Sequence, residues 1–143
     1  MNAVVNFDEF IRKGIVKKQK PDTSRANFLL KEAENSYANL HEKLSKIELR
    51  DENANDFVKS CDDILMELIR AKMLLVGYNA SGQGAHEAEV SYLRVLGFKE
   101  VEIQFADQIR YFRNGMLYYG TQLDKKYAEK VIEFTKKKYA ELK

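Results

Sequence analysis

This chain of 143 residues is poor in the residues that interrupt or cross-link a fold. It has one proline and seven glycines, so we expect few turns and long helices. Its single cysteine, Cys61, cannot form a disulfide within the chain, which favours a reducing compartment. No apolar run approaches the roughly 20 residues of a membrane span, and the N-terminal MNAVVNFDEF lacks a signal-peptide pattern. We therefore expect a cytoplasmic protein with no membrane contact.

The composition gives little indication of metal binding or of nucleic-acid binding. The chain has two histidines and one cysteine, without the spacing of a metal site, and we expect neither a metal nor a cofactor. The formal net charge of +2 is too small to indicate a nucleic-acid-binding protein by itself. Basic residues are nevertheless concentrated at 12–20 and 136–138, where they form either a solvated surface or a rim for RNA phosphates.

The only proline, Pro21, separates an N-terminal arm, residues 1–20, from a body, residues 21–143. Apolar residues in the arm predict one short helix packed on the body; they are Phe7, Phe10, Ile11 and Ile15. Polar residues at 22–24 can cap the next helix, because their side chains accept hydrogen bonds from its first amides. This helix should be about 24 residues long and end before RDENAN at 50–55.

The body shows helical periodicity throughout. The first long helix carries an apolar seam in 4-3 spacing, formed by Ala26, Leu30, Ala33, Tyr37, Leu40, Leu44 and Ile47. Further helices are expected at about 55–76, around 90–96, at about 100–117 and at about 124–142. No segment sustains the alternation of a strand. The predicted fold is all-α, an up-down bundle of four or five helices with a short N-terminal helical arm.

The helix at 100–117 has one predicted core stripe, whose members fall within one arc of a helical wheel: Val101, Phe105, Ile109, Phe112, Met116 and Tyr119. Its end reads RYFRNGMLYYG, residues 110–120. Arginine offers a fork of donors that suits phosphate, and tyrosine offers a ring on which a base can stack. In an unbroken helix Arg113 and Tyr118 point about 140° apart. They can share a ligand only if the helix loosens near Gly115 or a symmetry mate supplies one of them.

Several polar residues have a simpler interpretation as structure. Asp107 and Arg110 are three residues apart and are expected to form an ion pair on a solvated face. His86 follows SGQGA at a predicted helix N-terminus, where it either caps the helix or helps to receive a phosphate. Cys61 lies on an apolar stripe and is expected to pack in the core, whereas His41 is expected to be solvated.

The segment RNGMLYYG resembles the signature of HEPN domains, small all-α domains of bacteria and archaea. In that signature an arginine, usually followed by a polar residue, precedes a histidine by roughly four to six residues. Arg113 and Asn114 match its first part, and Tyr118 or Tyr119 occupies the position of the histidine. The order of the helices is also similar to small members of the family, as are three segments: FIRKGIVKKQKPD (10–22), GY (77–78) and AHEAEVSYL (85–93).

The resemblance implies a homodimer in which two motif segments line one cleft. Active members cleave RNA without metal through the arginine and the histidine, and many are encoded beside a nucleotidyltransferase as a toxin-antitoxin pair. Tyrosine, with an ordinary pKa of about 10, is a poorer proton shuttle at neutral pH than histidine. We therefore expect binding of RNA or nucleotide phosphate, with weak or absent metal-independent RNase activity. The resemblance and the residue chemistry together assign catalysis to Arg113, Tyr118 and Tyr119, and binding to Asn114, Arg110 and His86.

The alternative is a non-catalytic helical module that dimerises or holds a partner such as a nucleotidyltransferase. The surroundings of Arg113 distinguish the two hypotheses. A solvent-filled cleft shared by Arg113 and Tyr118 would favour RNA binding. An internal ion pair between Arg113 and an acid such as Asp107 would favour the association module.

Overall fold

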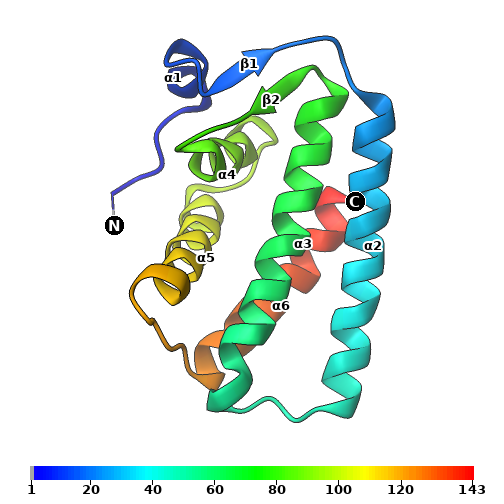
Figure 1. The fold of residues 1–143 in the computed structure, drawn as a ribbon, viewed down its shortest axis with the longest axis vertical. Helices are drawn as coiled ribbons and strands as arrows, with labels where there is room; N and C mark the ends of the chain where they lie inside the picture. The colour runs from blue at the N-terminus through cyan, green and yellow to red at the C-terminus, as the bar shows by residue number, and fades with distance from the viewer. Residues whose placement is uncertain (1) are drawn as a thin grey trace.

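The computed structural model describes residues 2–143 and confirms the predicted all-α bundle (Figure 1). The elements are α1 (Phe7–Arg12), β1 (Val16–Lys18), α2 (Thr23–Lys46), the 3-10 turn η1 (Asp51–Asn53), α3 (Ala54–Leu75), β2 (Tyr78–Ala80), α4 (Ala85–Val95), α5 (Glu100–Tyr118) and α6 (Lys125–Leu142). The five body helices therefore form where the apolar periodicity predicts them. The arm helix also forms, but it ends at Arg12, so Ile15 lies outside it.

The long helices α2 and α3 lie side by side and run in opposite directions (Figure 1). The predicted cap of α2 is confirmed, because the Asp22 carboxylate accepts a hydrogen bond from the Arg25 amide at 3.0 Å. The seam of α2 is buried at Ala26, Ala33 and Leu40. It does not extend to Ile47, which is 44% exposed, because α2 ends at Lys46 and the chain continues in an extended conformation.

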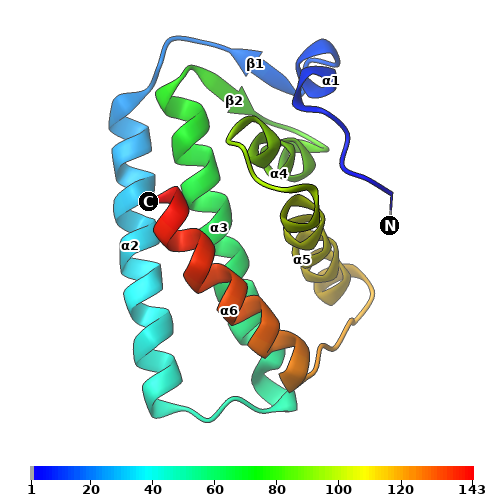
Figure 2. The same cartoon turned by 180° about the vertical axis from the view of Figure 1, so that it is seen from behind.

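The core is centred on α3. Phe57, Ile64 and Leu68 of this helix are fully buried, and Cys61 packs among them as predicted. Viewed from behind, α6 crosses α3 diagonally, with α2 on one side and α5 on the other (Figure 2). The C-terminal helix thus closes the back of the core, while α4 and α5 cover another side of α3.

The expectation that the chain contains no strand was wrong. β1 and β2 pair as a two-stranded antiparallel sheet, with Val16 opposite Ala80 and Lys18 opposite Tyr78. Each strand has only three residues, which is too short for alternation to be recognised in the sequence. The sheet ties the arm to the body. The arm helix α1 packs beside it with Phe7 and Phe10 buried, as predicted.

The predicted core stripe of α5 is only partly covered. Ile109 is buried and Phe105, Phe112 and Met116 are half-buried, as members of a core stripe should be. Two members were predicted wrongly: Val101 is 75% exposed and Tyr119 is 86% exposed. Tyr119 follows the last residue of the helix, and Val101 lies in its first turn.

Candidate functional site at the C-terminal end of α5

The segment RYFRNGMLYYG forms the last turns of α5, which remains helical through Gly115 to Tyr118. Gly115 is buried, and its carbonyl accepts hydrogen bonds from the amides of Tyr119 at 2.9 Å and Thr121 at 3.0 Å. A Cβ atom at position 115 would lie 3.1 Å from the Thr121 Cβ and would overlap its Oγ1. The glycine therefore permits a close return of the chain, and the helix does not loosen there.

Arg113 points from α5 toward the facing surface of α3. Its guanidinium pairs with Asp63 and, at 3.4 Å, with Asp62, and it also donates to the Lys59 carbonyl at 3.1 Å. The Arg113 side chain is 32% exposed, so one edge of the guanidinium still reaches solvent. The internal partner is therefore a pair of aspartates on α3 and not Asp107, the acid named as an example from the sequence.

Asp62 is the buried member of this pair, with a side chain only 5% exposed. Burial raises the pKa of its carboxyl, because water no longer solvates the charged form, while the charge of Arg113 opposes this shift. Asp62 therefore depends on Arg113 for most of the compensation of its charge. This dependence gives Arg113 a structural role within a single subunit.

Arg110 is not on a solvated face, which corrects the prediction for the Asp107–Arg110 pair. The two side chains are 11% and 10% exposed, and Arg110 Nε donates to Asp107 Oδ1 at 2.8 Å. A second carboxylate, that of Glu87 on α4, lies 3.9 Å from Arg110 Nη1. The helix wheel placed Asp107 opposite the core stripe and Arg110 to one side of it. It did not show that α4 covers that side of α5.

The three predicted binding residues come together in the folded chain. His86, Arg110 and Asn114 line one hollow of about 330 Å³ with the glycine-containing loop 82–85. His86 and Arg113 also line an adjoining hollow of about 350 Å³, together with polar residues of α3. His86 thus borders both hollows.

His86 does not cap α4, which corrects the prediction. The N-cap residue is Gly84, in a left-handed conformation with φ of 89°, and no side chain caps the helix. The predicted cap fails because His86 is already the second residue of the helix. No protein atom of residues 2–143 accepts a hydrogen bond from the amides of His86 and Glu87. These amides can therefore bind water or an anion.

Tyr118 and Tyr119 are separated from these hollows. They are 71% and 86% exposed, and neither lines the hollow that contains Arg113 or the one that contains Asn114. The unbroken helix accounts for this, because side chains five positions apart point in different directions. Within one chain, the tyrosines and Arg113 therefore cannot act on one reacting group.

Carboxylates outnumber cations around the two hollows. The guanidiniums are those of Arg70, Arg110 and Arg113. The carboxylates that line the hollows or pair with these guanidiniums are those of Asp62, Asp63, Glu67, Glu87, Glu89 and Asp107. Three positive groups thus face six carboxyl groups, and each arginine already has a partner. A phosphate in either hollow would therefore meet more carboxylates than guanidiniums.

The sequence analysis missed the contribution of α3. Arg70 forms a two-point ion pair with Glu89 of α4, at 2.6 and 2.9 Å, and the Glu89 side chain is only 2% exposed. A signal was present, because the polar residues of α3 recur at helical spacing beside its apolar stripe; they are Lys59, Asp62, Asp63, Glu67 and Arg70. In the structure this row of polar residues faces neighbouring helices, but the sequence alone does not show which helices they are.

Comparisons with protein-family models, curated proteins and solved structures found no match to this chain. Within residues 2–143, no group of three or more histidine, cysteine or acidic side chains is placed to hold a metal ion. The same part of the chain contains no helix with both the length and the apolar character that a membrane crossing needs.

Proposed function

We propose that this chain is a HEPN-like helical protein that acts by associating with a second protein chain, first of all another copy of itself. The proposed contact is the α5 tip, which consists of Tyr111, Leu117, Tyr118 and Tyr119. The observation that carries the proposal is the contrast at this end of α5. Arg113 is paired with Asp62 and Asp63, while the large apolar side chains near it are exposed.

The α5 tip has the composition of a protein interface. Its four side chains are between 55% and 86% exposed, and they come from about the last two and a half turns of the helix and the residue that follows it. Tyrosine is enriched at interfaces because its ring buries a large apolar area while its hydroxyl keeps a hydrogen bond. In a twofold dimer the same patch meets itself, so a single exposed patch can supply both sides of the contact.

Light scattering of the purified protein tests this contact. We expect a dimer for the wild-type chain at micromolar concentration, and a monomer for the Leu117→Glu, Tyr119→Glu double variant, because two buried charges would oppose association. Both side chains are exposed, so the circular dichroism spectrum should not change. Phe28→Glu is the matched control, since Phe28 is 62% exposed on α2. A wild-type monomer, or equal loss in the control, would contradict the proposal.

The resemblance to HEPN domains suggests what the dimer does. In that family the motif segments of two subunits lie together, and a nucleotidyltransferase is a common partner. A dimer through the α5 tip would bring two copies of Arg113 and of the tyrosine pair near one another. The nucleotidyltransferase is accordingly the partner class that we propose for the dimer, in a system of toxin-antitoxin type.

A second candidate function is the binding of RNA or nucleotide phosphate. It is favoured by the hollow that His86, Arg110 and Asn114 share beside the unpaired amides at the start of α4. We expect little or no cleavage of RNA, because each arginine is neutralised by a carboxylate and the tyrosines lie elsewhere. His86 lines both hollows, and histidine is the side chain best suited to proton transfer near neutral pH.

The second candidate is tested by measuring RNA binding and RNA cleavage across a salt series. The proteins compared are the wild type, Arg113→Ala and Asn114→Ala. Asn114 is exposed, so its loss should not disturb the fold. If phosphate binds in the shared hollow, Asn114→Ala should weaken binding about threefold to tenfold, and binding should fall with salt. Asn35→Ala, on the exposed surface of α2, is the control. Equal RNA binding by all four proteins would reject this function.

A further inference from the structure

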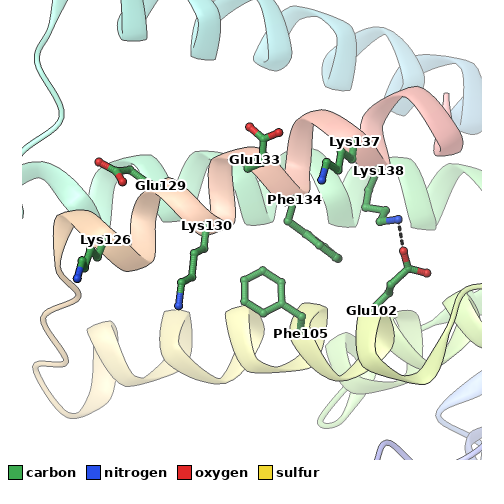
Figure 3. Close-up of a pocket in the computed structure, with 9 residues that line it drawn as sticks. All are labelled: Glu102, Phe105, Lys126, Glu129, Lys130, Glu133, Phe134, Lys137 and Lys138. Carbon is green, nitrogen blue, oxygen red and sulfur yellow. Dashed lines mark hydrogen bonds and ion pairs between the residues drawn. The ribbon is translucent and has the colours of Figure 1, made fainter.

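A hollow away from the motif lies between α5 and α6 (Figure 3). It encloses about 720 Å³ and is open to solvent. Its walls are formed by Glu102 and Phe105 of α5 and by Lys126, Glu129, Lys130, Glu133, Phe134, Lys137 and Lys138 of α6. We call it the α5–α6 groove. None of the residues of the HEPN-like motif lines it.

The floor of the α5–α6 groove is aromatic. Phe105 and Phe134 meet edge to face, with ring centroids 4.9 Å apart, and both are only half-buried. Tyr127 continues the row, with its ring 6.0 Å from that of Phe105 and 5.3 Å from that of Phe112. Phe105 of the predicted core stripe and Phe134 of α6 thus form a floor that the chain itself leaves partly uncovered. A partly covered apolar row between two helices can accept the ridge of a third helix.

The α6 wall of the groove is lined by a row of lysines. Lys126, Lys130 and Lys137 fall within about 40° of one another around the helix and span roughly 16 Å along it. Lys130 points across the groove toward α5, whereas Glu129 and Glu133 point away from α5 (Figure 3). No carboxylate of residues 2–143 forms an ion pair with these three lysines, although Lys138 beside them pairs with Glu102 and Glu141. Three ammonium groups next to an apolar floor are therefore available to a partner.

We propose that the α5–α6 groove is a docking site for an acidic amphipathic helix of a partner protein. The apolar side of such a helix would cover Phe105 and Phe134, and carboxylates along one edge would meet the lysine row. Charge complementarity would then fix the orientation of the helix, and apolar burial would supply most of the affinity. This inference does not rest on self-association through the α5 tip, because the two surfaces share no residue.

An acidic helix fits this groove better than a strand of RNA. Glu102, Glu129 and Glu133 also line the walls, so the groove carries both signs of charge. A helix can place its carboxylates along one edge only, opposite the lysines. The phosphates of RNA recur along the whole strand and would also meet the glutamates.

Binding of two fluorescein-labelled peptides of about 20 residues, long enough to form a helix, tests the proposal. One is an amphipathic helix with leucines on its apolar face and glutamates beside them, and the other has lysines in place of the glutamates. We expect the wild-type chain to bind the acidic peptide at least about tenfold more tightly than the basic peptide at low salt. A triple variant should abolish or reverse the preference for the acidic peptide; it carries Lys126→Glu, Lys130→Glu and Lys137→Glu.

The matched control is Lys17→Glu, Lys18→Glu, Lys20→Glu, which makes the same change of net charge in the exposed part of the arm. It should keep the preference for the acidic peptide. Equal affinity of the wild type for both peptides would overturn the proposal, as would an equal loss in the control. Stronger competition by a short single-stranded RNA than by unlabelled acidic peptide would also overturn it. Light scattering of each variant records the oligomeric state separately, so failure of this site is distinguishable from failure of the α5 tip.

Discussion

Arg113 and Tyr118 are five residues apart on α5, but their side chains lie in different environments. Arg113 faces two aspartates of α3, and Tyr118 is 71% exposed. The motif residues that the sequence groups together are therefore divided between an internal ion pair and a free surface. A residue type names the chemistry that a side chain can perform, but its partners decide whether that chemistry is available to a ligand.

Gly115 lies within the candidate motif, but its role is structural, because it permits the close return of the chain at Thr121. Alanine is favoured over glycine in a helix by about 1 kcal/mol. At this position, however, its Cβ would overlap Thr121, and such overpacking costs about 1 to 3 kcal/mol. The overlap opposes the gain in helix propensity, so we expect Gly115→Ala to lower the free energy of unfolding by up to about 2 kcal/mol in urea denaturation.

The double-mutant cycle with Thr121→Ala identifies the cause of this loss. Removing the Thr121 Oγ1 takes away the atom that the new methyl group would overlap. The cost of Gly115→Ala should therefore be smaller in the Thr121→Ala background. An unchanged cost, or a gain in stability from Gly115→Ala alone, would show that the close approach of Thr121 is not what requires glycine.

At the scale of elements, α5 and α6 are joined by aromatic rings along the groove and by one ion pair at its end. Lys138 of α6 is 6% exposed and donates hydrogen bonds to Glu102 of α5 and, at 3.2 Å, to Glu141. Burial disfavours the ammonium, but these hydrogen bonds outweigh it and raise the pKa of Lys138. The hydrogen bond from Lys138 likewise lowers the pKa of Glu102. The pair therefore remains charged across the neutral range.

Glu102→Gln tests this junction through its pH dependence. The variant keeps a carbonyl oxygen for the Lys99 amide but leaves the Lys138 ammonium with Glu141 alone. We expect a loss of about 1 to 2 kcal/mol in urea denaturation at about pH 7. Because the pKa of Glu102 is lowered in the folded state, its contribution is fully present above its ordinary value of 4.5 and is lost as the pH falls. The difference between variant and wild type should shrink at about pH 3.

Glu141→Gln is the control for this experiment. Glu141 contacts the same ammonium, but its side chain is 53% exposed, so solvent already screens the interaction. Glu141→Gln should therefore lower the free energy of unfolding by less than Glu102→Gln does at neutral pH. An equal cost for both variants would show that the junction between α5 and α6 does not depend on Glu102.

At the scale of the whole molecule, contacts distant in the sequence organise the candidate site. Asp62 and Arg113 are 51 positions apart, and Arg70 and Glu89 are 19 apart, but each pair joins two helices around the same hollow. The arm is held in a similar way, because β1 pairs with β2 across the chain between Lys18 and Tyr78. The bundle therefore places the two hollows, the α5 tip and the α5–α6 groove on a common framework.

The sequence by itself determined the helices, their order and most of their boundaries. The length of α2, the Asp22 cap and the burial of Cys61 follow from local hydrogen bonding and apolar periodicity, which short segments contain in full. Tertiary structure alone decided the partners: the aspartates that hold Arg113, the burial of Arg110, the exposure of Val101 and the pairing of two three-residue strands. Each depends on which distant segment packs nearby, because burial and ion pairing arise only between surfaces that the folded chain brings into contact.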